Sequence, residues 1–473
     1  MLDSTTAPQI FDEEFGTHYA AFAAALLVSD IPAAVLAAAR ENLFDTLACA
    51  IAGSSAHGVD TVRDLVEGWG GRPEAGILCS SIRVPAHHAA WVNGMMSHAR
   101  DYDDTHDAAV LHAGVSIIPA ALAAAQLAPA ASGADLLAGI VAGLELICRL
   151  GVSTRISIIE SGLMYTSLFG YFGATAAAAR VMGLDAAQTA NALGIAYSQA
   201  AGTHQVTRDG ASTKRMQPGF AAKAALLSVQ MSLRGVQGVV RTFEGIDGLF
   251  RSYLDNRVDT GRLRQGLGQS YEMLDLSYKP YPCCRFNHPA IEAALAIRRH
   301  PGFDPARVRS AVVHLTHDAY QAVCTPEDIR HAPRTIVQAQ FSIPYTVACA
   351  LLDGEVALRH FTEEGIRNPD VLALAARIDG RVDAAIDQEW SRNISPAIVT
   401  VDTELGRFEH RIDYPKGHPK SRMTAADFDA KLAGCMAASG LAWPADLPRR
   451  LHAAIDGLHA APDANTLIGL LTL

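Results

Sequence analysis

The sequence lacks several features that mark whole classes of protein. Its formal net charge is -10, so it lacks the basic surface that nucleic acids and anionic membranes require. Its eight cysteines include no C-x-x-C pair, and several lie in apolar runs, as is typical of reduced, buried thiols in a cytosolic protein. No apolar run reaches the ~18 residues of a membrane span, since the longest candidate, Val115 to Ala131, is broken by Pro119 and Gln126. The N-terminus also lacks the basic region of a secretory signal. We therefore expect a cytoplasmic protein with no nucleic-acid or membrane partner.

The composition that remains favours a large helical fold. The 473 residues are 49% hydrophobic and 19% charged, enough for a substantial core and for more than one domain. From about residue 31 to 268 one helical pattern follows another. The segment Ile31–Ala52 repeats apolar residues at helical spacing with Pro32 in its first turn, and Asp185 with Gln188 resembles a capping box. Small residues dominate these helices, which lets helix axes approach closely.

The pattern changes near Asp275. Residues Val308–Thr316 alternate as a strand does, and Ile398–Tyr414 reads as a hairpin with Gly406 in its turn. Helices are expected between these strands, over Pro289–His300 and Asp370–Ile378, with the second entered through Asn368 and Pro369.

The chain returns to helix near its end, where Thr424 is a predicted N-cap. We therefore expect a mainly α protein, with a large all-helical domain from 1–272 and 415–473 and a smaller α+β lid from 273–414.

Two segments hold most of the chemically reactive side chains. His98–Gly114 reads HARDYDDTHDAAVLHAG and holds four carboxylates and three histidines in a largely apolar chain. Ser277–Leu295 contains Lys279, Arg285 and His288 among aromatic, proline and cysteine residues. Acid/base groups in one segment and cations in the other predict a shared cleft, with a small polycarboxylate as its occupant.

Local patterns suggest how some of these groups are presented. If the stretch from Ala90 to Asp101 is helical, then Asn93, Ser97 and Asp101 form one polar stripe that delivers Asp101 to the cleft. Closely spaced Asp and His residues can also bind divalent ions. However, no H-E-x-x-H or EF-hand frame is present, so no metal is expected.

The lysines and cysteines of the sequence suggest further roles. Lys214 and Arg215 directly precede an Ala-rich helix, where a lysine can meet an anion at the helix N-terminus. Prolines and aromatic residues around Lys279 predict a desolvated ammonium with a lowered pKa, suited to acid/base work and anion binding. The adjacent Cys283 and Cys284 point in different directions and have no evident paired base, which disfavours a thiol nucleophile.

Six motifs in order carry a resemblance to a known family. They are DYDDTH with the following His112, then GLMYTSLFGYFGA, STKRMQPGFAA, YKPYPCCRFNH, FSIPYTVACALLDG and YPKGHP. In this order they resemble the MmgE/PrpD family, which includes 2-methylcitrate dehydratases, cis-aconitate decarboxylases and iminodisuccinate epimerases. The resemblance spans nearly the whole chain and implies a homodimer without a cofactor, whose substrate lies between helical domain and lid.

The resemblance also implies individual site residues. Asp101 matches the acidic position of the family's first active-site motif, and His112 matches its following histidine. Lys214 matches the lysine of K-R-x-x-x-G and Lys279 that of K-x-[YF]-P. Tyr345 matches the tyrosine ahead of the A-C-A-x-L-L-D-G helix. We assign the lysines to carboxylate binding, Asp101 and His112 to proton transfer or its orientation, and Tyr345 to hydrogen bonding or proton donation.

The chain departs from the family pattern at two positions, where Met164 and Gln217 replace histidines found in many members. The expected substrate-binding residues are Tyr165, Thr166, Arg215, Gln217, Arg285 and His288. The expected function is a dehydratase-like lyase that abstracts a proton next to a carboxylate of a small di- or tricarboxylate. A dicarboxylate epimerase is the close alternative; a metal-dependent hydrolase and a non-catalytic carboxylate-binding relative are the others.

Overall fold

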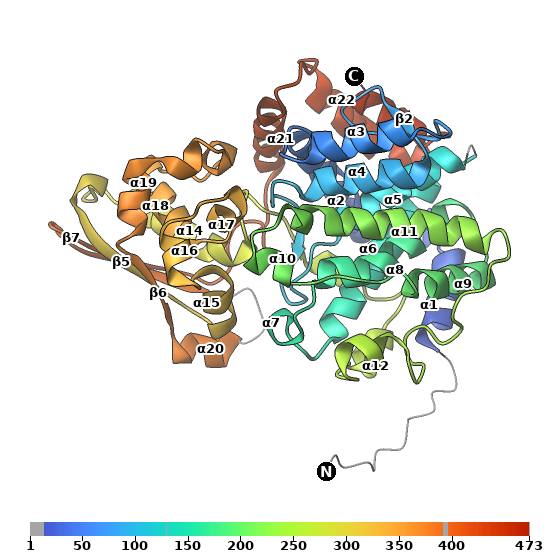
Figure 1. Ribbon diagram of the computed structural model, residues 1–473, viewed down its shortest axis with the longest axis horizontal. Coiled ribbons are helices and arrows are strands. Elements are labelled where there is room, and N and C mark those ends of the chain that lie inside the picture. The colour runs from blue at the N-terminus through green and yellow to red at the C-terminus, as the bar shows by residue number, and fades with distance from the viewer. Residues whose placement is uncertain (1–13, 129, 391–395, 473) are drawn as a thin grey trace, which may run out of the picture.

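The chain forms two regions, each with its own buried core. A computed structural model describes residues 14–128, 130–390 and 396–472. The helical region has a core drawn from residues 15–278 and 428–471, and the sheet region has a core drawn from residues 283–401. Figure 1 shows the sheet region beside the much larger helical region. The protein is therefore mainly α, as the sequence predicts.

The helical region contains both ends of the described chain. Its longer helices are α1 (Phe15–Ala25), α2 (Ala33–Gly53), α3 (Val59–Trp69), α4 (Ala86–His98), α5 (Gly114–Leu127), α6 (Gly133–Ser153), α8 (Tyr165–Val181), α9 (Ala186–Tyr197), α11 (Gln217–Ser232), α21 (Ala425–Ser439) and α22 (Leu447–Asp456). The predicted caps are confirmed at two of them. Asp185 and Gln188 form a capping box on α9, and Thr424 caps α21.

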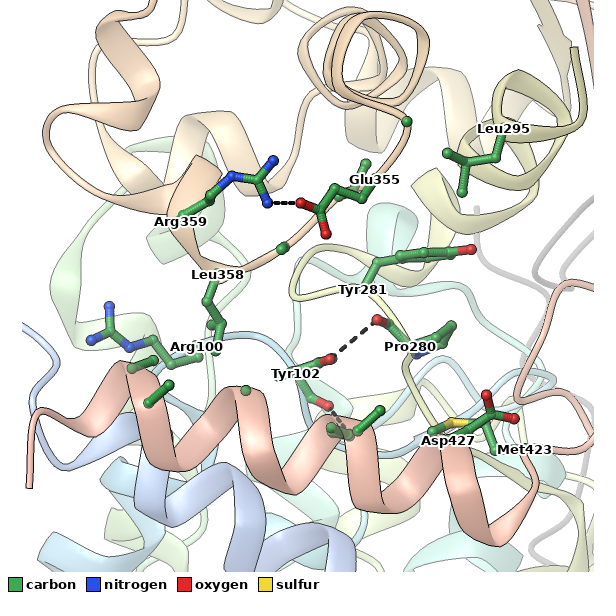
Figure 2. A pocket seen from close by; sticks show the side chains of 18 of the residues that line it. Arg100, Tyr102, Pro280, Tyr281, Leu295, Glu355, Leu358, Arg359, Met423 and Asp427 are labelled. Carbon is green, nitrogen blue, oxygen red and sulfur yellow. Dashed lines mark hydrogen bonds and ion pairs between the residues drawn. The ribbon is translucent and has the colours of Figure 1, made fainter. Parts of the chain in front are cut away.

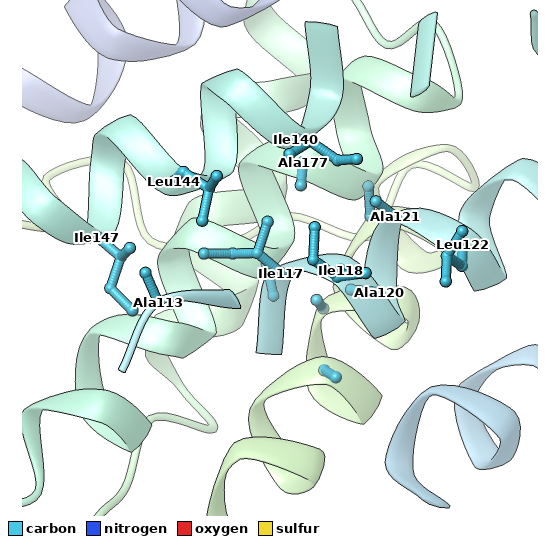
Figure 3. Close-up of a cluster of buried hydrophobic side chains, with 14 of the residues drawn as sticks. Ala113, Ile117, Ile118, Ala120, Ala121, Leu122, Ile140, Leu144, Ile147 and Ala177 are labelled. Atoms are coloured by element: carbon cyan, nitrogen blue, oxygen red, sulfur yellow. The ribbon is translucent and has the colours of Figure 1, made fainter. Parts of the chain in front are cut away.

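Close packing of α5, α6 and α8 forms the centre of this region (Figure 3). Ile117 of α5 and Ile140 and Leu144 of α6 meet there with no exposed surface. A Cβ atom on Gly143 of α6 would lie 2.8 Å from the Cβ atom of Ala177 on α8. The small residues of the sequence therefore set how closely these helices approach, as expected.

Helix α6 is long and apolar enough to cross a membrane, judged by length and composition. The segment does not stand out as an apolar run in the sequence, because Glu145 and Arg149 interrupt it. The whole apolar window of α6 is buried inside the protein. Neighbouring helices, rather than lipid, cover this helix.

A four-stranded sheet with helices forms the second region. Its strands, in the order β6-β5-β7-β8, are β6 (Ile378–Val382), β5 (Val308–Leu315), β7 (Ala397–Thr403) and β8 (Gly406–Ile412). Only the β5–β6 pair is parallel. The longer helices around it are α14 (His288–Arg298), α18 (Ile343–Asp353), α19 (Pro369–Ala375) and α20 (Ala384–Trp390). Alternate residues Ala311, Val313 and Leu315 face the core, which confirms the strand and hairpin predictions.

One predicted helix of the sheet region ends earlier than expected. Helix α19 stops at Ala375, and Ile378 begins strand β6 instead of ending the helix. Ile378 pairs in parallel with Ala311 of β5 and is fully buried. A parallel partner lies far away in sequence, so local periodicity could not reveal this strand.

Two short strands join the segments that the sequence singles out. Strand β3 (Thr105–His106) pairs antiparallel with β4 (Leu276–Ser277). The Tyr278 N–H then donates to the Gly417 carbonyl at 2.9 Å. Gly417 has a φ of 86°, and a Cβ atom there would lie 1.7 Å from the Tyr278 carbonyl oxygen, so only glycine fits. Segments more than 130 residues apart therefore meet at one place.

Candidate active site

Asp101 lies beyond the end of its helix, not on it. Helix α4 ends at His98, and Asp101 adopts a left-handed backbone with a φ of 53°. The predicted polar stripe with Asn93 and Ser97 is therefore wrong. Asn93 instead accepts from the Leu78 N–H at 2.9 Å. The turn after α4, not helical spacing, presents the Asp101 carboxylate.

Two lysines hold Asp101 from different elements. Lys214 Nζ, in a short 3₁₀ turn before α11, donates to Asp101 Oδ1 at 2.9 Å. Lys279 Nζ donates to the Asp101 carbonyl oxygen at 2.9 Å and lies 3.5 Å from Oδ1. All three residues are buried. Asp101 Oδ2 has no hydrogen-bond partner in the part of the chain that the structure describes, so it is available to a ligand.

Charge pairing, rather than burial, sets the ionisation of this group. Burial alone would raise the pKa of Asp101, but Lys214 and Lys279 hold it well below its usual range. Burial alone would lower the pKa of Lys279, but Asp101 and Asp103 more than offset it, so the pKa is raised. The predicted lowering of the Lys279 pKa is therefore wrong, because a carboxylate accompanies the buried ammonium. Lys279 is charged and fixed, which suits anchoring and not proton transfer.

Two histidines share one carboxylate beside this group. Asp103 Oδ2 lies 2.9 Å from His98 Nδ1 and 3.0 Å from His112 Nδ1. His112 Nδ1 also faces the Asp104 carbonyl oxygen at 2.7 Å. Because both neighbours of His112 Nδ1 are acceptors, this nitrogen carries a proton, and Nε2 is the ring nitrogen left to exchange a proton with a ligand.

The same reasoning fixes the tautomer of His98. Its Nδ1 donates to Asp103, and its Nε2 accepts from Lys214 Nζ at 3.2 Å. Burial is the main cause that lowers the pKa of His98 to about 4. Burial would raise the pKa of Asp103, yet His98 and His112 hold it well below the usual range. The arrangement is a buried carboxylate that orients two imidazoles, one of them toward the ligand space.

Asp104, the next carboxylate, has a structural role. Its two oxygens accept from the Ala113 and Gly114 N–H groups at the start of α5, both at 3.0 Å. Burial and the neighbouring Asp103 raise its pKa to about 6. Asp104 therefore holds the backbone next to His112 in place.

A small cavity lies in front of these groups. Of the residues predicted from sequence, it is lined by Asp101, His112, Thr166, Lys214 and Arg285. Thr166 Oγ1 accepts from the His112 N–H at 2.9 Å. Lys279 lies directly behind Asp101 without reaching the cavity wall. The structure thus brings together groups from four segments of the chain around one space.

Arg285 reaches the cavity with most of its donors already used. Its guanidinium donates to both oxygens of Asp107 at 3.2 to 3.3 Å and to the Lys416 carbonyl oxygen at 3.0 Å. His288 Nδ1 lies 3.3 Å from Nη1 of Arg285. His288 is fully buried, outside the cavity, and burial and Arg285 lower its pKa well below the usual range. His288 thus supports Arg285 and does not contact the ligand space.

The structure places four other predicted residues away from the cavity. The Tyr345 hydroxyl lies in the sheet-region core and donates to the carbonyl oxygens of His360 and Gly365 at 2.7 and 3.1 Å. The Tyr165 hydroxyl donates to the Ile156 carbonyl oxygen at 2.7 Å, beside a neighbouring cavity. Neither hydroxyl points into the cavity, because each donates a hydrogen bond to a backbone carbonyl oxygen.

Arg215 and Gln217 flank the site at a distance. Arg215 is buried, and burial with nearby Arg100 lowers its pKa to about 10. Gln217 Nε2 donates to the Thr203 carbonyl oxygen at 3.1 Å. Neither residue lines the cavity, so their predicted contact with substrate is not seen in this arrangement.

A larger groove lies on the other side of the Asp101 turn. Figure 2 shows it between α21 and the sheet region, with Arg100 and Tyr102 on one side and Glu355 and Arg359 on the other. Its volume is about 700 Å³. Arg100 and Tyr102 flank Asp101 in sequence, but none of the predicted site residues lines this groove. The predicted site residues that line a cavity thus gather at the smaller one and not at this groove.

Sequence reasoning missed several residues of the cavity. Behind the cavity wall, His98 and His112 share the Asp103 carboxylate, an arrangement that depends on the turn after α4 and not on sequence spacing. Cys284, set aside as a nucleophile, lines the cavity, and burial raises its pKa to about 11. The remaining wall residues are Thr105, Val110, Ile158, Met164, His204, Thr207, Phe286, Ala322 and Phe341. The aromatic residue of this set nearest a lysine is Phe341, whose ring lies 4.9 Å from Lys214 Nζ.

Comparison with known proteins decides the family. The model of the MmgE/PrpD N-terminal domain matches residues 17–260, and that of the MmgE/PrpD C-terminal domain matches residues 281–442. The chain belongs to the MmgE/PrpD family. The two matched segments together contain the cavity's acid/base groups and its cations.

Relatives within the MmgE/PrpD family share modest identity with this chain. It is 28% identical to the cis-aconitate decarboxylase-like protein oryM of Aspergillus oryzae, over 73% of this chain and 75% of the relative. It is 26% identical to a cis-aconitate decarboxylase of Aspergillus terreus, over 78% of each chain. The human cis-aconitate decarboxylase is 24% identical over 82% of this chain and 80% of its own. These relatives are lyases, which supports an enzymatic role for this MmgE/PrpD protein.

Proposed function

We propose that the protein is a cofactor-independent lyase that removes a proton next to a carboxylate of a small di- or tricarboxylate. The observation that carries this proposal is the His112–Asp103 pair beside the Asp101–Lys214 pair. One supplies a proton acceptor and the other supplies positive charge in a buried cavity. Lyases that form an enolate-like state need both.

His112 is the proposed base. Asp103 and the Asp104 carbonyl oxygen fix the proton on Nδ1, so Nε2 accepts the substrate proton. The imidazolium that forms is then stabilised by Asp103, as in other His–Asp pairs. Thr166 accepts a hydrogen bond from the His112 N–H and so fixes the backbone that carries the imidazole ring.

Lys214 is the proposed carboxylate anchor at the reacting centre. Its ammonium has three donors, and two of them are used by Asp101 and His98. The third can bind a substrate carboxylate and stabilise charge that develops on it. Lys279 keeps Asp101 in place and ionised, and Arg285 adds positive charge on the opposite wall.

The outcome after proton removal separates the lyase from the alternative epimerase. A dehydratase expels hydroxide from the neighbouring carbon, which leaves as water, whereas an epimerase returns a proton to the opposite face. A decarboxylase begins instead with loss of carbon dioxide, and the electron pair left on carbon then takes up a proton. Cis-aconitate, which the relatives' names specify, is the first candidate substrate, followed by 2-hydroxy and 2-amino dicarboxylates. Incubation in deuterated water, followed by NMR, should show an unsaturated or decarboxylated product. Deuterium at an inverted carbon without loss of mass would instead establish the epimerase.

The metal-dependent hydrolase is the less favoured alternative. His98, Asp103 and His112 could present three ligand atoms within 4.8 Å of one another. However, the Asp103 oxygen already accepts from both histidines, and the Lys214 ammonium lies 3.2 Å from His98 Nε2. A cation there would face that ammonium, so the set fits protons better than a metal. Stoichiometric metal whose removal by a chelator abolishes activity would favour the hydrolase.

The assembly and compartment of the protein remain predictions. A homodimer, expected from the family resemblance, can be tested by light scattering. A cytoplasmic location is supported by the eight free cysteines, of which seven are buried and Cys284 is partly buried.

A further inference from the structure

One histidine in the cavity wall is not used by the proposed mechanism. His204 lies just before the short helix α10 (Gln205–Arg208), which Figure 1 shows where the helical region meets the sheet region. Its side chain lines the same cavity as Met164, Thr166 and Lys214. Only 6% of the residue is exposed. A histidine this deeply buried normally has a hydrogen-bond partner.

One ring nitrogen of His204, Nδ1, is buried and has no such partner within residues 14–128, 130–390 and 396–472. Burial, together with Arg208 and Lys214, lowers the pKa of His204 to about 4. The ring is therefore neutral near pH 7, with one nitrogen as donor and the other as acceptor. It can donate to an anion without adding a further charge to the cavity.

The backbone around His204 is fixed against the segment that carries Met164. The His204 N–H donates to the Gly162 carbonyl oxygen at 2.9 Å. A Cβ atom on Gly202 would lie 3.0 Å from the Met164 carbonyl oxygen and 2.9 Å from the Ser167 Cβ atom. This close approach fixes the backbone before His204 against the segment that carries Met164.

Gln217 holds the same segment from the other side. Its Nε2 donates to the Thr203 carbonyl oxygen at 3.1 Å, one residue before His204. Met164 and Gln217 are the two positions at which the sequence departs from the family pattern. In the structure Met164 lines the same cavity as His204, and Gln217 binds the carbonyl oxygen of the residue that precedes His204.

We propose that His204 contacts the substrate, donating a ring N–H to a carboxylate or hydroxyl oxygen, and that Gln217 is its positioning residue. The inference rests on the proposed function only for the chemical class of the ligand, a small polycarboxylate. It explains why a buried imidazole nitrogen is left without a partner among the described residues: its partner is the ligand. His204 would also provide an imidazole in the cavity, where Met164 replaces the histidine of many family members.

Binding of a non-reacting probe tests this inference separately from turnover. The probe is propane-1,2,3-tricarboxylate, titrated calorimetrically into the wild-type protein and into His204→Leu and His204→Gln. Loss of a hydrogen bond to a charged ligand should weaken binding about 10- to 100-fold in His204→Leu. His204→Gln retains a donor and should bind more tightly than His204→Leu. Equal affinity of the wild type and His204→Leu would overturn the inference.

His88 supplies a matched control. It too has a pKa lowered to about 4, mainly by burial, and a buried Nδ1 without a partner among the described residues. It lies on α4, with its ring 5.2 Å from that of Trp69, and does not line the cavity. His88→Leu should bind the probe as the wild type does. An equal loss of affinity in His88→Leu would show that the His204 effect is general destabilisation.

NMR spectroscopy of the wild-type protein tests whether His204 contacts the probe even if a leucine variant folds poorly. With ¹⁵N-labelled histidine, the ring signals of His204 are assigned by their absence in His204→Gln. Added probe should shift these signals, and Gln217→Leu should reduce the shift while the protein remains folded. Unchanged His204 signals at saturating probe would overturn the inference. If the wild type binds the probe but converts no candidate acid, the lyase proposal fails and the His204 result still stands.

Discussion

The two sides of the cavity differ in what their polar groups are free to do. The helical region contributes Asp101 with a free oxygen, His112 with a ring nitrogen left for proton exchange and Lys214 with a remaining donor. The other wall contributes Arg285, mostly occupied by Asp107 and Lys416, and Cys284, whose pKa is raised to about 11 mainly by burial. In the proposed function, the first wall carries the reaction and the second covers it and supplies fixed charge.

The largest expected effect comes from His112 on the reacting wall. His112→Gln should lower kcat by about 100- to 10,000-fold, the usual contribution of a positioned acid or base. Steady-state kinetics with cis-aconitate, or with the acid identified in the deuterium experiment, measures this. Circular dichroism should show an unchanged fold. Near-normal turnover in His112→Gln would show that another residue is the base.

Substitutions of the two lysines should have different effects, one mainly on stability and the other mainly on turnover. Lys279→Met leaves Asp101 without its fully buried partner and should lower the free energy of unfolding by about 3 to 5 kcal/mol. Lys214→Met should lower turnover by about 10- to 100-fold, since it removes a charge-assisted contact of about 1.5 to 3 kcal/mol. Urea unfolding and kinetics of both variants test the difference. The distinction fails if Lys279→Met is as stable as the wild type.

A substitution of Tyr345 in the sheet region should lower stability without lowering turnover. Tyr345→Phe removes the donor to the His360 and Gly365 carbonyl oxygens and should cost about 1 to 3 kcal/mol of stability. Turnover of the folded variant should match the wild type. A large fall in kcat at unchanged stability would restore Tyr345 as a site residue.

The smallest expected effect is a pH dependence that arises from His98. Its pKa is about 4 in the folded protein and near 6.5 in an unfolded chain. Between these values the unfolded chain binds a proton that the folded protein does not, so the free energy of unfolding falls as the pH falls. Asp104, with its pKa raised to about 6, acts in the opposite direction below that pH.

A variant isolates the His98 contribution from that of Asp104. From pH 7.5 to pH 5, the wild type should lose about 1 to 2 kcal/mol more stability than His98→Gln. Urea unfolding of both proteins at the two pH values measures the difference. Parallel losses would mean that His98 is protonated in the folded state over this range.

The sequence predicted elements whose causes are local. Caps at Asp185 and Thr424, the alternation of Val308–Leu315 and the hairpin over Ile398–Tyr414 depend on neighbouring residues, and the structure confirms them. Gly406 itself is the first residue of β8 and follows the turn. Strand β6 depends on a parallel partner from another part of the chain, and it was missed for that reason.

The same distinction applies to the candidate site. The motifs identified Asp101, His112 and Lys214 by type and order, and these residues line one cavity. They did not reveal that Lys279 has a raised pKa, because that follows from the distance to Asp101. Nor did they reveal that the Tyr345 hydroxyl serves backbone carbonyls, because side-chain direction depends on tertiary packing.

The pairing of strands β3 and β4 also bears on how the protein folds. Thr105 meets Ser277 only after the chain between them has closed a long loop, and such contacts are slow to form. We expect the site to assemble late, after the helices have packed, and a nascent chain that ends before β4 to have no site. A bound polycarboxylate would then stabilise only the finished protein, by mass action, so ligand affinity during refolding reports completion of the fold.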